Sequence, residues 1–128
     1  NEKVKLNESR QLVSKMKNTF FVHGLQADYI VNEINLSPHP VLVAGDLNDI
    51  AGSYAYSVIK AQKKDPFLEK GAGLGATFMS SSSSILQRLP TLRIDYIFHP
   101  DIYQTKQFIR SGKKLSDHLF LVSDIAIH

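Results

Sequence analysis

Apolar positions recur at spacings of three and four residues from Ser9 to Leu36. This period predicts an amphipathic helix, with Asn7 or Ser9 as its cap. Gly24 lies in the middle of the pattern and predicts a kink or a break into two helices. The segment Ser37-Pro38-His39-Pro40 ends the helix, because proline restricts its own backbone and that of the residue before it.

The pattern changes after these two prolines. Val41-Leu42-Val43-Ala44 is apolar at every position, which predicts a strand buried on both faces, in a sheet covered by helices. Apolar positions between Ser53 and Gln62 predict a second helix, which Asp65-Pro66 closes. Gly71 to Gly75 indicates a turn, and the run Ser80 to Ser84 indicates a surface loop.

Strand-like apolar runs dominate the second half of the chain. They cover residues 94–98, 103–109 and 119–127. A long helix, a buried strand and a β-rich second half are together typical of a layered α/β fold. The length of 128 residues fits a single domain.

A polar segment, Gly45-Asp46-Leu47-Asn48-Asp49, follows the first predicted strand. Asp46 lies at the carboxyl end of that strand, where open α/β sheets place their ligands. If the alternation of the strand continues, Asn48 lies on the same side as Asp46, and its amide could donate to a phosphate oxygen or to an attacking water. The same segment is also typical of a tight turn.

Asp95 lies inside the apolar segment Ile94-Asp95-Tyr96-Ile97-Phe98. An ionised carboxylate in a sheet interior is costly unless it is paired and hydrogen-bonded. A histidine is a natural partner, since the carboxylate orients the imidazole and makes it more basic. A structural salt bridge with the neighbouring Arg93 is the alternative interpretation.

The tripeptide Ser116-Asp117-His118 precedes the last apolar run. Asp117 could bind a metal ion, while His118, oriented by Asp95, acts as general base or acid. The alternative is a capping turn with an incidental histidine. We expect the remaining histidines to lie at the surface or in loops; they are His23, His39, His99 and His128.

These three polar elements, in this order, resemble the last three motifs of the endonuclease/exonuclease/phosphatase family. The resemblance implies a phosphoesterase that hydrolyses phosphodiesters or phosphomonoesters with activated water and requires Mg²⁺ or Mn²⁺. By motif position it implies catalytic roles for Asp46, Asn48, Asp95 and His118, and metal binding by Asp46 and Asp117.

The family also has an Asn and a metal-binding Glu on early strands, which nothing in residues 1–36 supplies. We therefore expect residues 1–128 to be the carboxyl-terminal part of one domain whose amino-terminal half is absent. The implied fold is half of a four-layered α/β sandwich, with a mostly antiparallel or mixed sheet flanked by helices. We expect little or no activity from this piece alone, and self-association through an exposed sheet face.

Composition adds little to this picture. The net charge of +3 mildly favours phosphate-bearing ligands such as nucleic acids, phospholipids or small phosphodiesters, and no stable protein partner is evident. A non-catalytic module that binds nucleic acid or a phospholipid headgroup is the alternative function. Cysteine is absent, which excludes disulfides, thiolate zinc sites and a cysteine nucleophile.

The compartment stays open. The chain has no run of about 18 apolar residues that would predict a membrane span, and no basic start followed by an apolar stretch. Whether an upstream segment carries a targeting signal or an anchor is also open.

Overall fold

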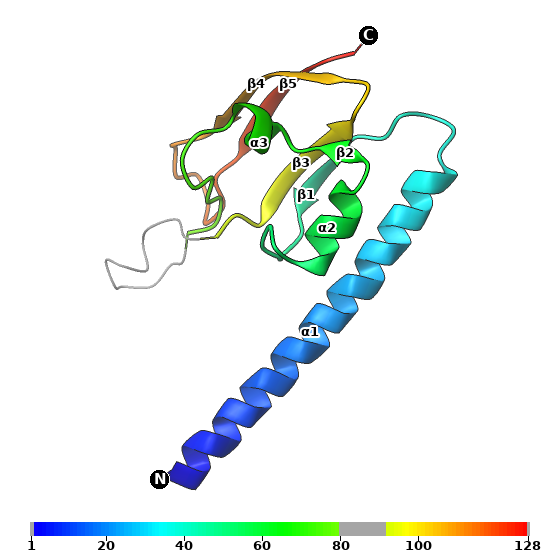
Figure 1. The fold of residues 1–128 in the computed structure, drawn as a ribbon. Helices are drawn as coiled ribbons and strands as arrows, with labels where there is room; N and C mark the ends of the chain where they lie inside the picture. Colours follow the sequence, from blue (N-terminus) through cyan, green and yellow to red (C-terminus); the bar gives the residue numbers. More distant parts are fainter. Residues whose placement is uncertain (1, 80–91, 128) are drawn as a thin grey trace.

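The computed structural model describes residues 2–79 and 92–127 (Figure 1). The elements of these residues are, in order, α1 (Glu2–Leu36), β1 (Val43–Asp46), α2 (Tyr54–Lys60), β2 (Lys63–Lys64), α3 (Pro66–Lys70), β3 (Asp95–Pro100), β4 (Gln104–Arg110) and β5 (Leu121–Ala126). The predicted loop at Ser80 to Ser84 lies outside the described residues, as does His128. Among the helices described, none is both long enough and apolar enough to cross a bilayer.

Two antiparallel sheets organise the strands. β3 is the central strand of a three-stranded sheet in the order β1-β3-β2, while β4 and β5 form a two-stranded sheet. The register of the first sheet pairs Val43 with Phe98, Ala44 with Ile97 and Asp46 with Asp95. Helices with antiparallel sheets make this an α/β fold, which confirms the predicted class.

The hydrophobic core lies between β3 and the two helices α1 and α2, which run side by side (Figure 1). Its buried residues are Ala27, Ala55, Tyr56, Ile59, Tyr96 and Phe98. The rings of Tyr56, Tyr96 and Phe98 pack with centroids 5.0–5.6 Å apart. Aromatic clusters of this kind contribute more than their buried area alone. The core therefore covers one face of the three-stranded sheet.

The helix α1 is longer than predicted and has no break at Gly24. One glycine inside a helix costs only about 1 kcal/mol, which the surrounding turns offset. The amino-terminal half of α1 projects beyond the rest of the described chain (Figure 1). Its large apolar side chains are accordingly exposed, as at Leu12 and Phe20. The predicted end at the Ser37-Pro38 step is confirmed, since the helix stops at Leu36.

The prediction of a strand buried on both faces at Val41-Leu42-Val43-Ala44 is wrong. The strand β1 begins at Val43 and lies at the edge of the sheet. Val43 packs against the core, whereas Leu42 and Ala44 are exposed. A continuous apolar run gives a strand two apolar faces. Within the described residues, only the face of β1 that carries Val43 is covered, by the hydrophobic core.

The prediction that Asp65-Pro66 only closes the second helix is also incomplete. The helix α2 starts where it was predicted, with Ser53 as its N-cap, and Asp65 then caps a further short helix, α3. The carboxylate of Asp65 also accepts hydrogen bonds from the Tyr56 hydroxyl at 2.9 Å and from the Arg93 guanidinium at 2.7 Å. Arg93 is therefore the partner of Asp65, and the alternative salt bridge between Arg93 and Asp95 does not form.

Two histidines differ from the expectation of surface or loop positions. His99 is fully buried in β3, where its Nε2 lies 2.7 Å from the Thr105 hydroxyl. That hydroxyl donates to Glu69, so the histidine joins β3, β4 and α3 in one polar network. His23 lies partly buried on α1, with Nδ1 3.1 Å from the buried carboxylate of Asp49. His39 is exposed in the connection between α1 and β1, as expected.

Candidate active site

Asp46 and Asp95 are brought together by the pairing of β1 with β3, where they are opposite each other in the register. Side chains alternate between the two faces of a strand, so residues two apart share a face. Tyr96 and Phe98 face the core, which places Asp95 on the other face together with Ile97. The two carboxylates therefore lie at the end of the open face of the sheet.

His118 lies against Asp95. Its Nδ1 is 2.9 Å from Oδ2 and 3.1 Å from Oδ1 of Asp95, while its Nε2 is 3.9 Å from Oδ2 of Asp46. Because Asp95 accepts at Nδ1, the tautomer with hydrogen on Nδ1 leaves Nε2 free to exchange a proton. The predicted pairing of Asp95 with a histidine is thus present in the structure.

The electrostatic environment of His118 favours its protonated form. The hydrogen bond to Asp95 raises the pKa of His118, and the negative charges of Asp95, Asp46 and Asp117 raise it further. Partial burial of the ring acts in the opposite direction. The imidazole is consequently more basic than an exposed histidine.

Local structure holds His118 in place. The Ser116 hydroxyl accepts a hydrogen bond from the His118 backbone N–H and donates to its carbonyl, both at 2.9 Å. The His118 ring packs edge-on against Phe78, with centroids 5.2 Å apart. The strand-like segment around Phe78 runs beside it, since Leu119 N donates to the Thr77 carbonyl at 2.7 Å. This polar turn corresponds to the predicted Ser116-Asp117-His118 element.

Thr77 is a site residue that the sequence did not single out. Its side chain is completely buried, and its hydroxyl donates to Oδ2 of Asp95 at 2.6 Å. The Thr77 hydroxyl oxygen itself accepts hydrogen bonds from the backbone N–H groups of Ile94 and Asp95, both at 3.2 Å. The hydroxyl thus fixes the carboxylate that in turn orients His118. A threonine between two apolar residues, Ala76 and Phe78, is the only local signal of this role.

Asn48 lies just beyond β1, in a turn rather than in a continuing strand. Its backbone has φ = 51°, in the left-handed region that asparagine tolerates better than most residues. Its N–H donates to Oδ1 of Asp46 at 2.7 Å, and its own side chain is exposed. The Tyr96 hydroxyl donates to the Asp49 carbonyl at 2.9 Å and so ties the end of this turn to β3. The alternative of a tight turn is therefore present in the structure, and the strand does not continue to Asn48.

The donor set of the site suits a hard cation. Ligand atoms of Asp46, Asp95 and His118 all lie within 4.8 Å of one another. The Asp95 carboxylate already accepts hydrogen bonds from Thr77 and His118. Asp46 is exposed, and its carboxylate has lone pairs available for a metal ion. Asp117 is exposed beside His118 but is not part of this group of three. Oxygen ligands of this kind fit Mg²⁺ or Mn²⁺, which need only one or two protein carboxylates.

Comparison with known proteins agrees with this geometry. The sequence profile of the Endonuclease/Exonuclease/phosphatase family matches residues 19–118, which include the whole site. The chain belongs to this family. The family includes enzymes that act on phosphate esters. No curated protein matches the chain.

Three solved structures share the fold at low sequence identity. A functionally unknown conserved protein from Enterococcus faecalis superimposes with a TM-score of 0.70 at 21% identity, covering 84% of this chain and 45% of that one. A family protein from Bacteroides thetaiotaomicron gives 0.61 at 18%, covering 83% and 45%. A mannosyl-6-phosphatase from the same organism gives 0.54 at 18%, covering 82% and 44%. The chain thus spans less than half the length of these proteins.

Proposed function

We propose that this protein is a metal-dependent phosphoesterase that hydrolyses a phosphodiester or phosphomonoester with an activated water. The observation that carries the proposal is the hydrogen bond of 2.9 Å between Asp95 and His118, with Asp46 beside the free nitrogen of the ring. A basic imidazole next to an exposed carboxylate is suited to taking a proton from water at Nε2. Membership of the family supports the same chemistry.

Each side chain has a separate role in this proposal. His118 exchanges the proton of the attacking water or the leaving oxygen at Nε2, and Asp95 keeps the ring oriented through Nδ1. The exposed amide of Asn48 donates a hydrogen bond to a phosphate oxygen. Asp46 positions the water and would hold the metal ion.

Magnesium or manganese would be held by Asp46, with Asp117 as a further carboxylate of the metal site. When bound, such an ion neutralises charge on the phosphate oxygens. Asp95 is a poorer ligand here, because its oxygens are engaged by His118 and Thr77. The assignment of metal binding to Asp46 and Asp117 agrees with their exposed positions.

We also propose that the chain corresponds to the carboxyl-terminal half of the family's domain. Its coverage of 44–45% of the three solved structures supports this. Site groups on the other half would then be needed for full preorganisation, which catalysis requires. On this proposal the 128 residues alone have low activity, so activity is to be measured on the full-length protein.

The test of the function is phosphate ester hydrolysis with magnesium and with chelator. We expect magnesium-dependent cleavage of bis-(p-nitrophenyl) phosphate or p-nitrophenyl phosphate, and a large loss in Asp46→Asn. Asp101→Asn is the matched control, since Asp101 is exposed near the opposite end of β3. Equal rates with and without metal, or no loss in Asp46→Asn, would contradict the proposal. Phosphate binding without metal dependence or hydrolysis would favour the non-catalytic module.

The open face of the sheet supports one further proposal for the chain taken alone. Leu42 is 48% exposed, and Ala44 and Ile97 are cross-strand partners on the same face. We propose that this apolar face pairs with a second copy of the chain when no other part of the domain covers it. Sedimentation velocity tests this, and a single monomeric species up to the highest concentration would contradict it.

A further inference from the structure

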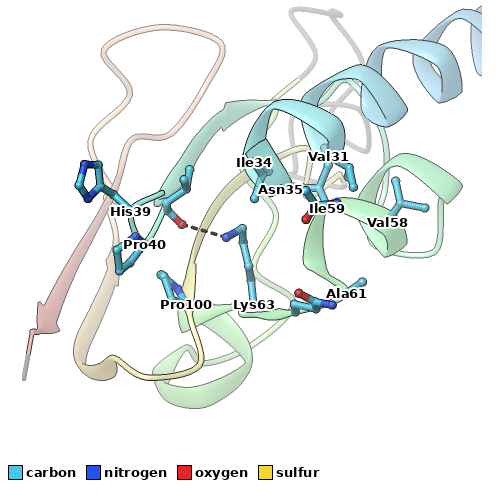
Figure 2. A pocket seen from close by; sticks show the side chains of 12 residues that line it. Val31, Ile34, Asn35, His39, Pro40, Val58, Ile59, Ala61, Lys63 and Pro100 are labelled. Atoms are coloured by element: carbon cyan, nitrogen blue, oxygen red, sulfur yellow. Dashed lines mark hydrogen bonds between the residues drawn. The ribbon is translucent and has the colours of Figure 1, made fainter. Parts of the chain in front are cut away.

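A pocket of about 370 Å³ lies at the end of the sheet that is remote from the candidate active site (Figure 2). Val41, which precedes β1, and Pro100, which ends β3, both line it. Asp46 and Asp95 lie at the opposite ends of the same two strands. The volume falls in the lower part of the range of small-molecule sites. The pocket is therefore separate from the phosphoesterase chemistry proposed above.

One side of this pocket is aliphatic. The helices α1 and α2 contribute Val31, Ile34, Val58 and Ile59. These side chains gather on the side of the pocket away from His39 and Pro40 (Figure 2). Apolar walls of this type favour the hydrocarbon part of a ligand, because its apolar surface is removed from water.

A single ammonium group lies in the middle of the pocket. The Nζ atom of Lys63 donates to the Val41 carbonyl at 2.9 Å, and its side chain is partly buried (Figure 2). An ammonium has three N–H donors, and this carbonyl is its only hydrogen-bond partner among residues 2–79 and 92–127. Burial lowers the pKa of Lys63, which indicates a partly desolvated charge. Such a charge gains more from an anionic partner than an exposed lysine does.

The charge around Lys63 favours a ligand with one negative charge. Asp101 is close enough to raise the pKa of Lys63 by its own charge. Within the described residues, Lys63 is the only lysine or arginine that lines the pocket. His39 lies at the edge of the pocket (Figure 2). A doubly charged phosphate would meet one ammonium and one opposing carboxylate. A monocarboxylate needs only the one ammonium that is present.

We propose that this pocket binds a short aliphatic monocarboxylate, with the carboxylate on Lys63 and the hydrocarbon chain against Ile34 and Val58. The ammonium supplies two donors that the protein leaves free, which matches the two oxygens of the headgroup. The aliphatic wall accepts the chain. The site lies outside the phosphoesterase site and does not depend on its assignment.

The proposal is tested by titrating hexanoate into the protein while recording amide chemical shifts and heats of binding. We expect saturable shifts at Ile34, Val58 and Lys63, with weaker binding of hexanol and of inorganic phosphate. Lys63→Met keeps the length of the side chain and removes its charge. It should weaken hexanoate binding at least about 10-fold, which corresponds to one charged hydrogen bond.

A second variant keeps the test independent of Lys63. Ala61 lines the pocket at the exposed end of α2, so Ala61→Leu should fill part of the volume and weaken hexanoate binding. Ala72→Leu adds the same bulk to an exposed loop residue and should leave binding unchanged. Absence of saturable binding, equal affinity in Lys63→Met, or shifts centred on His118 would overturn the proposal.

Discussion

Nδ1 of His118 lies 2.9 Å from Oδ2 of Asp95, although the two residues are 23 positions apart in the sequence. The carboxylate belongs to the central strand of a sheet, and the histidine to a turn before β5. Their contact therefore requires the tertiary fold. It also makes the properties of each side chain depend on the other.

Removing the charge of Asp95 should lower the pKa of His118. The Asp95 hydrogen bond and charge are the main causes that raise this pKa, so Asp95→Asn should bring it toward the ordinary value of about 6.5. The measurement is an NMR titration of the His118 ring signals. Asp124→Asn, at an exposed position on β5, should not shift the titration. An unchanged titration in Asp95→Asn would contradict the assigned cause.

The same pKa shift makes stability depend on pH. A histidine whose pKa is raised on folding binds its proton more tightly in the folded chain. Its stabilising contribution is complete below the unfolded value of about 6.5 and is lost as pH rises through the folded value. We therefore expect the stability difference between wild type and His118→Gln to shrink with rising pH. The midpoints of urea denaturation of both proteins, taken across this pH range, measure the difference. A stability difference that grows with rising pH would contradict the expected direction.

Loss of the Thr77 hydroxyl should destabilise the protein and disturb the site. Thr77→Val leaves the Asp95 carboxylate without one donor and two backbone N–H groups without their acceptor. We expect a loss of about 1–3 kcal/mol in the free energy of unfolding. Thr77→Ser keeps the hydroxyl and should lose about 1 kcal/mol or less, for one methyl group. Equal losses in the two variants, by urea denaturation, would show that the hydroxyl is not responsible.

Asn48 offers a way to separate backbone strain from phosphate binding. Because its φ is 51°, Asn48→Ala should lose about 1 kcal/mol of stability, while Asn48→Gly should be close to neutral. Both variants lack the amide that we propose contacts phosphate. Their catalytic efficiency should therefore fall together, although their unfolding free energies differ. Full activity in Asn48→Gly would remove this role from the side chain.

Loss of Arg93 should destabilise the protein strongly, because Arg93 and Asp65 form a buried pair. The two side chains are 9% and 1% exposed, and the guanidinium also lies over the rings of Phe67 and Tyr96 at 4.5 and 4.6 Å. Arg93→Met leaves the buried carboxylate of Asp65 without its opposite charge, which costs about 3–5 kcal/mol. Arg10→Met removes the same charge from an exposed position on α1 and should stay within about 0.5 kcal/mol. A loss below 1 kcal/mol in Arg93→Met would contradict this assignment.

Local sequence patterns predicted the longer elements, but not the short strand β2 and helix α3. Ser53 marks the start of the predicted helix, and in the structure its side chain accepts from Tyr56 N as the N-cap of α2. Asp46 and Asp95 could be recognised because each interrupts or ends an apolar run. Their pairing across two strands agrees with the register of the sheet.

Features set by distant contacts could not be read from the sequence. Thr77 acts on Asp95 across 18 positions, and His99 is buried because Thr105 and Glu69 satisfy it. The apolar run that includes Leu42 gives no indication of which face of a sheet is covered. Burial of polar groups and coverage of faces are properties of the assembled layers rather than of any short segment.

The proposed proton transfer by His118 is tested most directly in the full-length protein. The measurement is the rate of p-nitrophenolate release by the His118→Gln variant with magnesium present. Removal of the side chain that we propose as general acid and base should lower the rate about 10²–10⁴-fold relative to wild type. His39→Gln, at an exposed histidine remote from the site, should keep the wild-type rate. A His118→Gln rate equal to that of wild type would show that the imidazole held by Asp95 does not perform the proton transfer.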